Sequence, residues 1–469
     1  EMVEADEDPA ASPATSGEDS ETGGGGGEAA PSKSAERRAR RRFEKARRRE
    51  DHYRSHTRQL RALMEVLQGL LSAAQPRCQP IPEQVREHDT VTAAQRLKRK
   101  GVPTEAEAEA ALAAVEAILR AGVEVPYRTL PEAFGPAEGV AVMGAMLDRP
   151  QKYQDKFLGQ ELSLIAKIWA LAKGGSQGEA TGTRICIVDI GAGNGCLALL
   201  AAILLDGYAV LLDHTLPPDE LRVEVKVPEP YRSRVLRVTG DVRDVDPGRD
   251  IEPLLAKHGV ERVVIVAKHL CGVGTDLAAG FVQRWQRLAS MEDKAAPPRT
   301  RLLGAIFATC CGHKIGQADR AVFRELHAHD SYLKELTGGD EGRLNDILAL
   351  CTRCIAWRTT AGDIASRITS FQVLAAELFE DMLQQPRRNL LRSLFPEVIE
   401  VAFVPMAQSP QNRCLLAGAP DALRLAMAPG PLFLTELRAA RDALLAALGG
   451  PLDLKPKGFV SSKYDYDGQ

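Results

Sequence analysis

Two apolar runs in the chain each end in side chains that can do acid–base chemistry or line a reactive site. Val-Val-Ile-Val-Ala at residues 263–267, and a second run that ends at Thr309, have the composition of buried strands. The polar groups that follow are Lys268, His269 and Cys271 after the first run, and Cys310, Cys311 and His313 after the second. Ligands bind outside the carboxyl ends of parallel strands, so neighbouring strands would bring these groups together. The two runs therefore predict a catalytic site.

Five apolar runs alternate with helical patterns along residues 184–311. This alternation predicts a mostly parallel sheet that helices cover on both faces. Two further strands, residues 397–405 and 412–420, are joined by a short connection, which demands an antiparallel pair. The predicted fold class is α/β, with a seven-stranded Rossmann-like sheet and an antiparallel hairpin at its edge. The five parallel strands are predicted at residues 184–190, 208–214, 234–241, 262–269 and 302–311.

A glycine-rich loop follows the first predicted strand. In IVDIGAGNG, residues 187–195, Gly191, Gly193 and Gly195 stand between that strand and a helical sequence. Glycine lets the backbone take a tight turn and approach a ligand closely. Asp189, just before the first glycine, would repel the pyrophosphate of a dinucleotide, but it suits the ammonium group of S-adenosylmethionine. We therefore predict S-adenosylmethionine as the cofactor, with a dinucleotide and a purely structural turn as the alternatives.

Two more carboxylates follow the next two predicted strands. Asp213 ends its strand about 20 residues after the glycine loop, the spacing at which a carboxylate accepts both ribose hydroxyls of an adenosine cofactor. Asp241 lies where such folds reach the adenine amine, and a turn-forming aspartate is the alternative. Both carboxylates are predicted to bind the cofactor together with Asp189 and the three glycines.

The motifs at the predicted site resemble those of one family. IGAGNG, AKHLCGVGTDLA and ATCCGHK, with SPQN before the last strand, look like motifs of the eukaryotic tRNA methyltransferase family that methylates the ribose 2′-hydroxyl of nucleotide 4 in the acceptor stem. RPQKYQDKFLGQELSLIAKI, residues 149–168, resembles the lead-in to that family's catalytic domain, and the likeness spans roughly residues 149–420. The resemblance implies a tRNA ribose 2′-O-methyltransferase that uses S-adenosylmethionine, with a methyltransferase-type Rossmann-like sheet.

The chain departs from the family pattern in two places. Where the family reads Cys-Cys-His-His-Arg-Cys, this chain has Cys-Cys-Gly-His-Lys-Ile at residues 310–315. Relatives also carry amino-terminal zinc-binding cysteines and histidines, whereas Cys78 is the only cysteine before Cys186 here. Two alternative functions therefore stay open. One is a methyltransferase of the same fold that acts on a protein or a small molecule, and the other is a non-catalytic RNA-binding protein with this fold.

Methyl transfer to a ribose hydroxyl needs aligned reacting atoms and a group that takes the hydroxyl proton. Our order of candidates for that base is His269, Lys268 and then His313. As a cation, Lys268 could instead stabilise the developing alkoxide. A hydrogen-bonded residue at a strand end, without a catalytic role, is the alternative for each. Asp276 follows a glycine turn and is predicted to cap a helix rather than to act as an acid.

Three cysteines and a histidine at the predicted site have side chains that can bind zinc. These are Cys271, Cys310, Cys311 and His313. Adjacent residues of a strand point to opposite faces, so Cys310 and Cys311 would need an irregular backbone to share one ion. We expect the three thiols to line the active site and the CxxC of Cys351 and Cys354 to lie in an apolar helix. No metal is predicted.

The amino-terminal part of the chain differs from the rest in composition. Residues 1–50 hold an acidic stretch rich in Gly, Ser and Pro and then a cationic block at residues 37–49, and we predict a disordered tail. Residues 51–148 show helical patterns around the basic RLKRK at residues 96–100, so a small helical domain that can contact RNA is predicted. Residues 149–469 are predicted to form the methyltransferase domain.

The charge distribution leaves room for an RNA partner. The formal net charge is −3, but the first thirty residues hold nine acids and no Lys or Arg, so the remainder carries +6. Predicted phosphate contacts are residues 37–49, residues 96–100, Arg387 and Arg388. No run approaches the roughly 20 apolar residues of a membrane span, and nine cysteines without a secretory leader indicate a reducing compartment. We expect tRNA as the partner, no obligatory protein partner, and a cytoplasmic or nuclear location.

Overall fold

The computed structural model describes most of the chain between residues 130 and 455. The described ranges are 130–174, 183–290, 300–310, 312–345, 347–349, 370–405, 408–409 and 411–455, with Arg40, Phe43, Glu44 and Ile355. Residues 1–55 and 56–469 form two separate units, and the sheet lies in the second. Apart from the three residues near position 40, the predictions for the acidic tail, the cationic block, RLKRK, and Cys351 and Cys354 lie outside the described residues.

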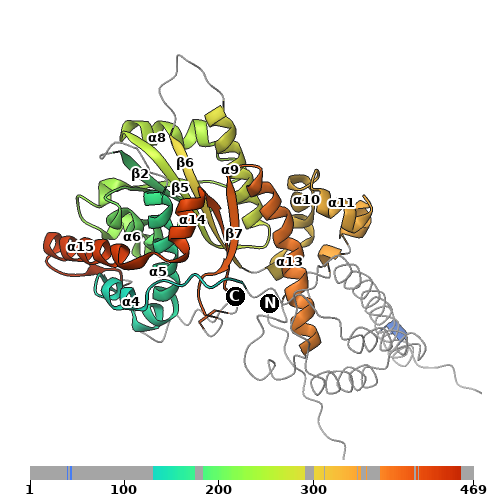
Figure 1. Ribbon diagram of the computed structural model, residues 1–469, viewed down its shortest axis with the longest axis horizontal. Coiled ribbons are helices and arrows are strands. Elements are labelled where there is room, and N and C mark those ends of the chain that lie inside the picture. The colour runs from blue at the N-terminus through green and yellow to red at the C-terminus, as the bar shows by residue number, and fades with distance from the viewer. Residues whose placement is uncertain are drawn as a thin grey trace, which may run out of the picture. The chain divides into compact units, whose positions relative to one another are not determined.

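A sheet of seven strands, in the order β4-β3-β2-β5-β6-β8-β7, forms the centre of the fold (Figure 1). Its parallel strands are β2 (Arg184–Ile190), β3 (Tyr208–Asp213), β4 (Val235–Thr239), β5 (Val260–Cys271) and β6 (Arg301–Cys310). β8 (Arg413–Gly418) runs antiparallel to both β6 and β7 (Glu397–Ala402). The predicted series of strands and the hairpin at the edge are therefore confirmed.

The order of the strands reverses between β2 and β5. From β2 the chain proceeds to β3 and β4 on one side, and it then returns to build β5 and β6 on the other side. Open α/β sheets bind ligands beyond the carboxyl ends of the two strands at such a reversal. The glycine loop leaves β2 and the Lys-His-Leu-Cys-Gly turn ends β5 at this point, so the topology brings both motifs to one place.

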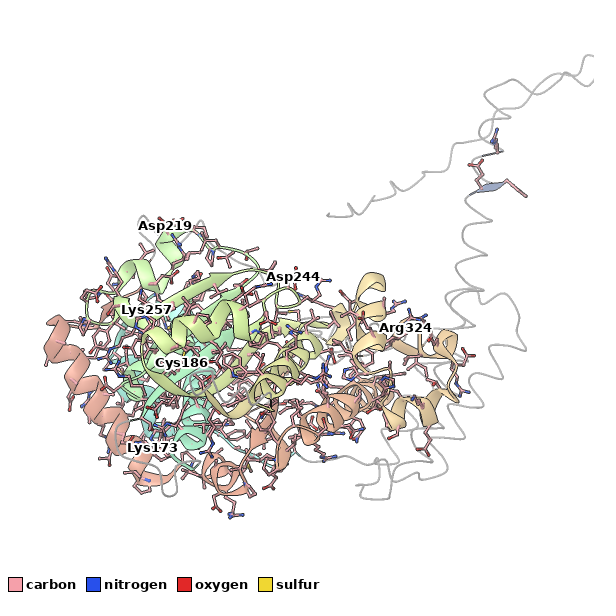
Figure 2. All side chains as sticks on the ribbon, turned by 90° about the horizontal axis from the view of Figure 1, so that it is seen from above. Lys173, Cys186, Asp219, Asp244, Lys257 and Arg324 are labelled. Carbon is pink, nitrogen blue, oxygen red and sulfur yellow. The ribbon has the colours of Figure 1, made fainter. Side chains whose placement is uncertain are left out.

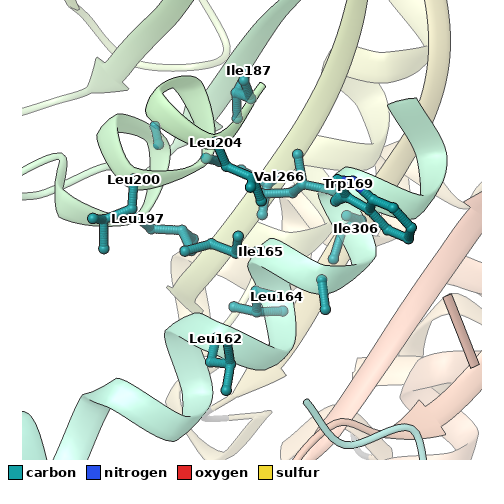
Figure 3. Close-up of a cluster of buried hydrophobic side chains, with 14 of the residues drawn as sticks. Leu162, Leu164, Ile165, Trp169, Ile187, Leu197, Leu200, Leu204, Val266 and Ile306 are labelled. Atoms are coloured by element: carbon teal, nitrogen blue, oxygen red, sulfur yellow. The ribbon is translucent and has the colours of Figure 1, made fainter. Parts of the chain in front are cut away.

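Helices cover both faces of the sheet, so alternate residues of a central strand enter two different cores. Ile185 and Ile187 of β2 belong to one buried cluster, and Cys186 and Val188 belong to the other. The first cluster, part of which is drawn in Figure 3, includes residues of α5 (Gln151–Gly174), α6 (Cys196–Leu204), α14 (Pro420–Met427) and α15 (Gly430–Leu448). The second includes residues of α8 (Glu252–Lys257), α9 (Gly274–Ser290) and α13 (Ser370–Arg392).

The position of each helix follows from its side chains. Every residue of α6 is buried, and the helix is apolar throughout. By contrast, α9 is amphipathic and turns Phe281 and Trp285 toward the sheet. Cys186 lies well inside the molecule in Figure 2, whereas Asp219 lies at its outside. Among the described residues, no helix is both long and apolar enough to cross a bilayer.

The segment before α5 packs on the same core as the sheet. α4 (Ala137–Gly144) contributes Val142 to the first cluster, and β1 (Leu147–Asp148) pairs with β9 (Leu452–Asp453) near the end of the chain. Lys167 of α5 is buried, and its Nζ donates to the carbonyl oxygen of Ala133 at 2.5 Å. The helical region predicted for residues 51–148 is thus described from residue 130 onward, where it is attached to the sheet.

Candidate functional site

The glycine loop after β2 takes backbone conformations that favour glycine. Gly191, Gly193 and Gly195 have φ values of +71°, +53° and +85°. A Cβ added at Gly195 would lie 2.4 Å from Leu211 Cδ1, so glycine there lets α6 pack against β3. At Gly193 an added Cβ would have no heavy atom within 4 Å. The loop is therefore tightly packed at one glycine and faces open space at another, where a ligand can approach the backbone.

Asp213, at the end of β3, is held against this loop. Its Oδ2 accepts a hydrogen bond from the backbone N–H of Gly193 at 2.8 Å, and its Oδ1 accepts from the N–H of Thr215 at 3.1 Å. On the other side of the loop, Arg237 Nη1 donates to the carbonyl oxygen of Gly193 at 3.0 Å, while its guanidinium pairs with Glu224. The structure thus brings the predicted glycine loop and Asp213 together, and it adds Arg237 and Glu224 as supports that the sequence did not reveal.

Asp241, after β4, lies beside Asp213 along the carboxyl edge of the sheet. The N–H of Gly240 donates to the carbonyl oxygen of Asp213 at 2.9 Å, which sets the spacing of the two loops. The carboxylate of Asp241 accepts two hydrogen bonds from the Arg243 side chain, at 3.1 Å from Nε and 2.6 Å from Nη2. These bonds hold the pKa of Asp241 below its usual value. A ligand amine that reached Asp241 would have to share this carboxylate with Arg243.

Asp189 is a buried carboxyl group one residue before the end of β2. Its side chain is 3% exposed, and burial raises its pKa to about 7. The positive charge of Lys268 acts in the opposite direction, while the negative charge of Asp213 adds to the increase. Near neutral pH the proton of Asp189 is therefore readily lost when a further positive charge arrives.

Lys268, on β5, points toward a group of buried side chains. Its Nζ lies 4.9 Å from the centroid of the Phe157 ring on α5. Burial lowers the pKa of the Lys268 ammonium, and the negative charge of Glu161 partly offsets that effect. Because its pKa is lowered, this amine can lose its proton more easily than a lysine at the surface.

A buried ion pair beside Lys268 was missed by the sequence analysis. Arg149 Nη2 lies 2.6 Å from Glu161 Oε2, and both side chains are 7% exposed. Arg149 Nη1 also lies 3.8 Å from the Sγ of Cys196, whose pKa is raised to about 12 by burial and by Glu161. The thiol is therefore neutral. The one sequence signal was a glutamate within the mostly apolar stretch of α5 that continues to Ala172 and also contains Gln160, Ser163 and Lys167.

The two reactive tips are neighbours in the sheet. β5 and β6 are paired in parallel, and Cys271 stands opposite Cys310 in the register. His269 belongs to β5, and His313 belongs to the short helix η4 (Gly312–Lys314) after β6. The side chains of His269, Cys310 and His313, and the whole of Cys311, lie outside the described part of the structure. Their closeness to one another is thus supported by the backbone, and their roles stay predictions.

Three sequence predictions near this edge need correction. Asp276 does not cap a helix from outside, because it lies within the first turn of α9, where its carboxylate pairs with Arg387. Arg387 and Arg388 are 2% and 4% exposed, so they cannot contact the phosphates of an RNA. Arg388 pairs with Glu400 of β7. A pair of arginines in a sequence does not reveal whether buried carboxylates face them, and here Asp276 and Glu400 do.

No cluster of three His, Cys, Asp or Glu side chains that could hold a metal ion occurs in the described residues. Cys271 is exposed at the tip of β5, while Cys186, Cys196 and Cys414 are buried free thiols. Burial raises the pKa of Cys414 to about 12, so it is neutral as well. The described thiols therefore serve as apolar packing, with Cys271 the exception.

A glycine-to-alanine comparison tests whether the open side of the loop receives a ligand. Gly193→Ala forces a Cβ into a left-handed backbone and is expected to lower the free energy of unfolding by about 1 kcal/mol. Gly338, at the end of α11 (Ser331–Thr337), has φ +63° and equally free surroundings, so Gly338→Ala should cost about the same. We expect only Gly193→Ala to weaken the binding of S-adenosylmethionine, as measured by calorimetric titration. Equal affinity in the two variants would contradict a ligand at Gly193.

The central part of the chain is similar to known proteins. Residues 174–367 match the family model of Methyltransferase TRM13. The tRNA:m(4)X modification enzyme TRM13 of Eremothecium gossypii is 35% identical over 107 residues, which are 23% of this chain and 18% of that relative. The matched part thus spans less than a fifth of the relative's length. Residues 174–367 contain the glycine loop, the end of β5 and the end of β6, where the resemblance in the motifs lies. Over this segment, which is less than half of the chain, the sequence is similar to the methyltransferase domain of the TRM13 family.

Proposed function

We propose that this protein is a tRNA 2′-O-ribose methyltransferase that uses S-adenosylmethionine and modifies nucleotide 4 of the acceptor stem, on a Rossmann-like methyltransferase fold. The observation that carries this proposal is the glycine loop that faces open space at Gly193, next to Asp213 and across the strand reversal from Lys268. The match of residues 174–367 to the TRM13 family model supports methyl transfer, and the name of the relative, a tRNA modification enzyme, supports tRNA as the substrate. We propose the cytoplasm or the nucleus as the location.

The residues around the loop fit S-adenosylmethionine in charge and in space. A Cβ at Gly193 would enter the room that the loop leaves free. Asp213, whose side chain is 11% exposed, would accept the ribose hydroxyls, and Asp241 would lie near the adenine amine. Asp189 would face the ammonium group, because an ionised carboxylate at this buried position needs a cation nearby. When bound, the cofactor supplies a methyl group on a positively charged sulfur.

The residues at the end of β5 would act on the accepting hydroxyl. The ribose oxygen must lose its proton as it bonds to the methyl carbon, and His269 is our first candidate to take that proton. Lys268 would lie next to the developing alkoxide and stabilise it by its charge, with the base role as its alternative. Glu161 and the neutral thiol of Cys196 would keep this amine in place without competing as nucleophiles. Cys271, Cys310, Cys311 and His313 would line the same site.

An acceptor-stem substrate has to be held by its phosphates and by its 2′-hydroxyls. The major groove of an A-form helix is too narrow for side chains, so shape and charge would select the tRNA more than its bases. Because Arg387 and Arg388 are buried, the remaining candidates for this contact are the basic residues 37–49 and 96–100. These segments would bind the stem while the edge of the sheet receives the ribose.

Methylation of unmodified tRNA tests the proposal directly. The full chain is incubated with S-adenosylmethionine and with tRNA transcribed in vitro, and the product is digested and analysed by mass spectrometry. We expect one 2′-O-methylated nucleotide, at position 4 of the acceptor stem. A methyl group at another position would refute the assigned specificity. Cofactor binding without tRNA methylation would favour a protein or small-molecule substrate, and tRNA binding without cofactor binding would favour a non-catalytic protein.

A further inference from the structure

A buried group of three charged or polar side chains lies behind the candidate active site. Asp276 of α9 has no exposed side-chain surface, and it receives two hydrogen bonds from Arg387 of α13. These join Nε to Oδ1 at 2.8 Å and Nη2 to Oδ2 at 2.6 Å. His327, directly after α10 (Gln317–Leu326), places its Nε2 2.8 Å from Oδ1 of the same carboxylate. Three helices thus meet at a single carboxylate.

The same arginine also holds the turn that follows β5. Arg387 Nη2 donates to the carbonyl oxygen of Gly272 at 3.2 Å, and Thr275 Oγ1 donates to that of Leu270 at 3.2 Å. Gly272 has φ +61°, and a Cβ there would lie 2.8 Å from the carbonyl oxygen of Lys314. The turn is therefore fixed by hydrogen bonds from one side and by the tip of β6 from the other.

This arrangement joins a helical insertion to the reactive end of β5. α10, α11 and α13 lie between β6 and β7 in the sequence. His327 directly follows α10, and Arg387 lies on α13. Lys268 and His269 immediately precede the turn that Arg387 holds, and Cys271 lies within it. Although burial acts to raise it, the charge of Arg387 keeps the pKa of Asp276 below its usual value, so the carboxylate stays ionised and the bidentate pair persists.

We propose that Asp276, Arg387 and His327 form a positioning group that fixes the turn at residues 270–275 and thereby aligns Lys268 and His269 for methyl transfer. None of the three touches the reacting atoms. The alignment of Lys268 and His269 for catalysis rests on the proposed methyltransferase function, whereas the role of the group in fixing the turn is independent of that function. Loss of the group should therefore lower the rate of the chemical step and leave cofactor affinity unchanged, because Gly193 and Asp213 are held by each other and by Arg237.

Two neighbouring arginines allow a matched experiment. Arg387→Met removes the contacts to Asp276 and Gly272. Arg388→Met removes a similarly buried ion pair from the same helix, but Arg388 contacts Glu400, Asp381 and Gln385 and not the turn. We expect the single-turnover rate of tRNA methylation to be about 10- to 100-fold lower in Arg387→Met than in Arg388→Met. Cofactor affinity, measured by titration, should be the same in both.

Hydrogen exchange gives a second readout that needs no enzymatic activity. Amides at residues 270–276 should exchange about tenfold faster in Arg387→Met than in Arg388→Met, while β2 exchanges equally in both. Equal exchange in the turn would overturn the positioning role, whatever the substrate is. Faster exchange in a chain that methylates no tRNA would leave the positioning role intact and refute the proposed function instead. If Arg387→Met fails to fold, His327→Phe, which leaves the Asp276–Arg387 pair in place, should show a smaller increase in exchange, and no increase would count against the group.

Discussion

Lys268→Met is expected to lower the rate of methyl transfer by about 10²- to 10⁴-fold, the range that a single proton-transferring or charge-stabilising group contributes. Methionine keeps the length and the apolar stem of lysine, but it has no charge and no proton to exchange. The surroundings that lower the pKa of Lys268 by burial screen its charge less than bulk water would, so the loss of that charge should have a large effect. Single-turnover methylation of transcribed tRNA, at saturating cofactor, measures the effect on the chemical step.

Lys156→Met is the matched control for this variant. The Nζ of Lys156 lies 5.3 Å from the centroid of the same Phe157 ring, but the residue is exposed on α5. We expect its rate and cofactor affinity to equal those of the unaltered protein. A Lys268→Met variant that methylates at the normal rate would remove Lys268 from the mechanism, and His269→Ala would then be the test of the remaining candidate.

The affinity for S-adenosylmethionine should rise about tenfold from about pH 6 to about pH 8. The pKa of Asp189 is raised to about 7, so the carboxyl group is mostly protonated at the lower pH and mostly ionised at the higher. A cationic ligand binds the ionised form, so binding below the pKa must release a proton. Calorimetry in buffers of different ionisation enthalpy detects that proton directly, and titrations across the range give the affinity.

The variant Asp189→Asn tests whether Asp189, and not another titrating group, causes the pH dependence of cofactor affinity. The amide cannot ionise, so the variant should bind the cofactor weakly and with little dependence on pH.

The free energy of unfolding of the unaltered protein should fall with rising pH, whereas its affinity for the cofactor rises. Because the folded-state pKa is raised above the unfolded value of 3.8, this carboxyl group favours the folded state at low pH. That contribution is lost as the pH rises through about 7. If cofactor affinity or stability still depended steeply on pH in Asp189→Asn, that dependence would have to be assigned to another group.

The strand series was predictable because a parallel sheet buries both faces of its strands. The strand RICIVDI can be predicted without knowledge of its neighbouring strands, since a short run of β-branched and apolar residues between turn signals is typical of a buried strand. Gly193 and Asp213 were predictable for a similar reason. A loop and a carboxylate about 20 residues apart are joined by one βαβ step, so their contact at 2.8 Å is set by local topology.

Contacts across long stretches of chain were not predictable in this way. Arg387 is 111 residues from Asp276, and its sequence context of paired arginines favours a surface. The ion pair of Arg149 with Glu161 spans only 12 residues, but it was missed for a related reason, because the sequence shows the two charges and not their burial. Burial depends on which faces of helices meet, and the local pattern of residues along one helix does not reveal that.

By itself, the sequence determined the order and kind of the strands, the glycine loop and the two reactive tips, because local periodicity and short-range spacing encode these features. Only the tertiary structure decided which charges are buried and with what partners. It shows Lys268 beside Phe157 and under the influence of Glu161, and it shows Arg387 holding the turn after β5 rather than an RNA. A buried charge is stable only where packing brings a compensating group within reach, and packing is a property of the whole fold.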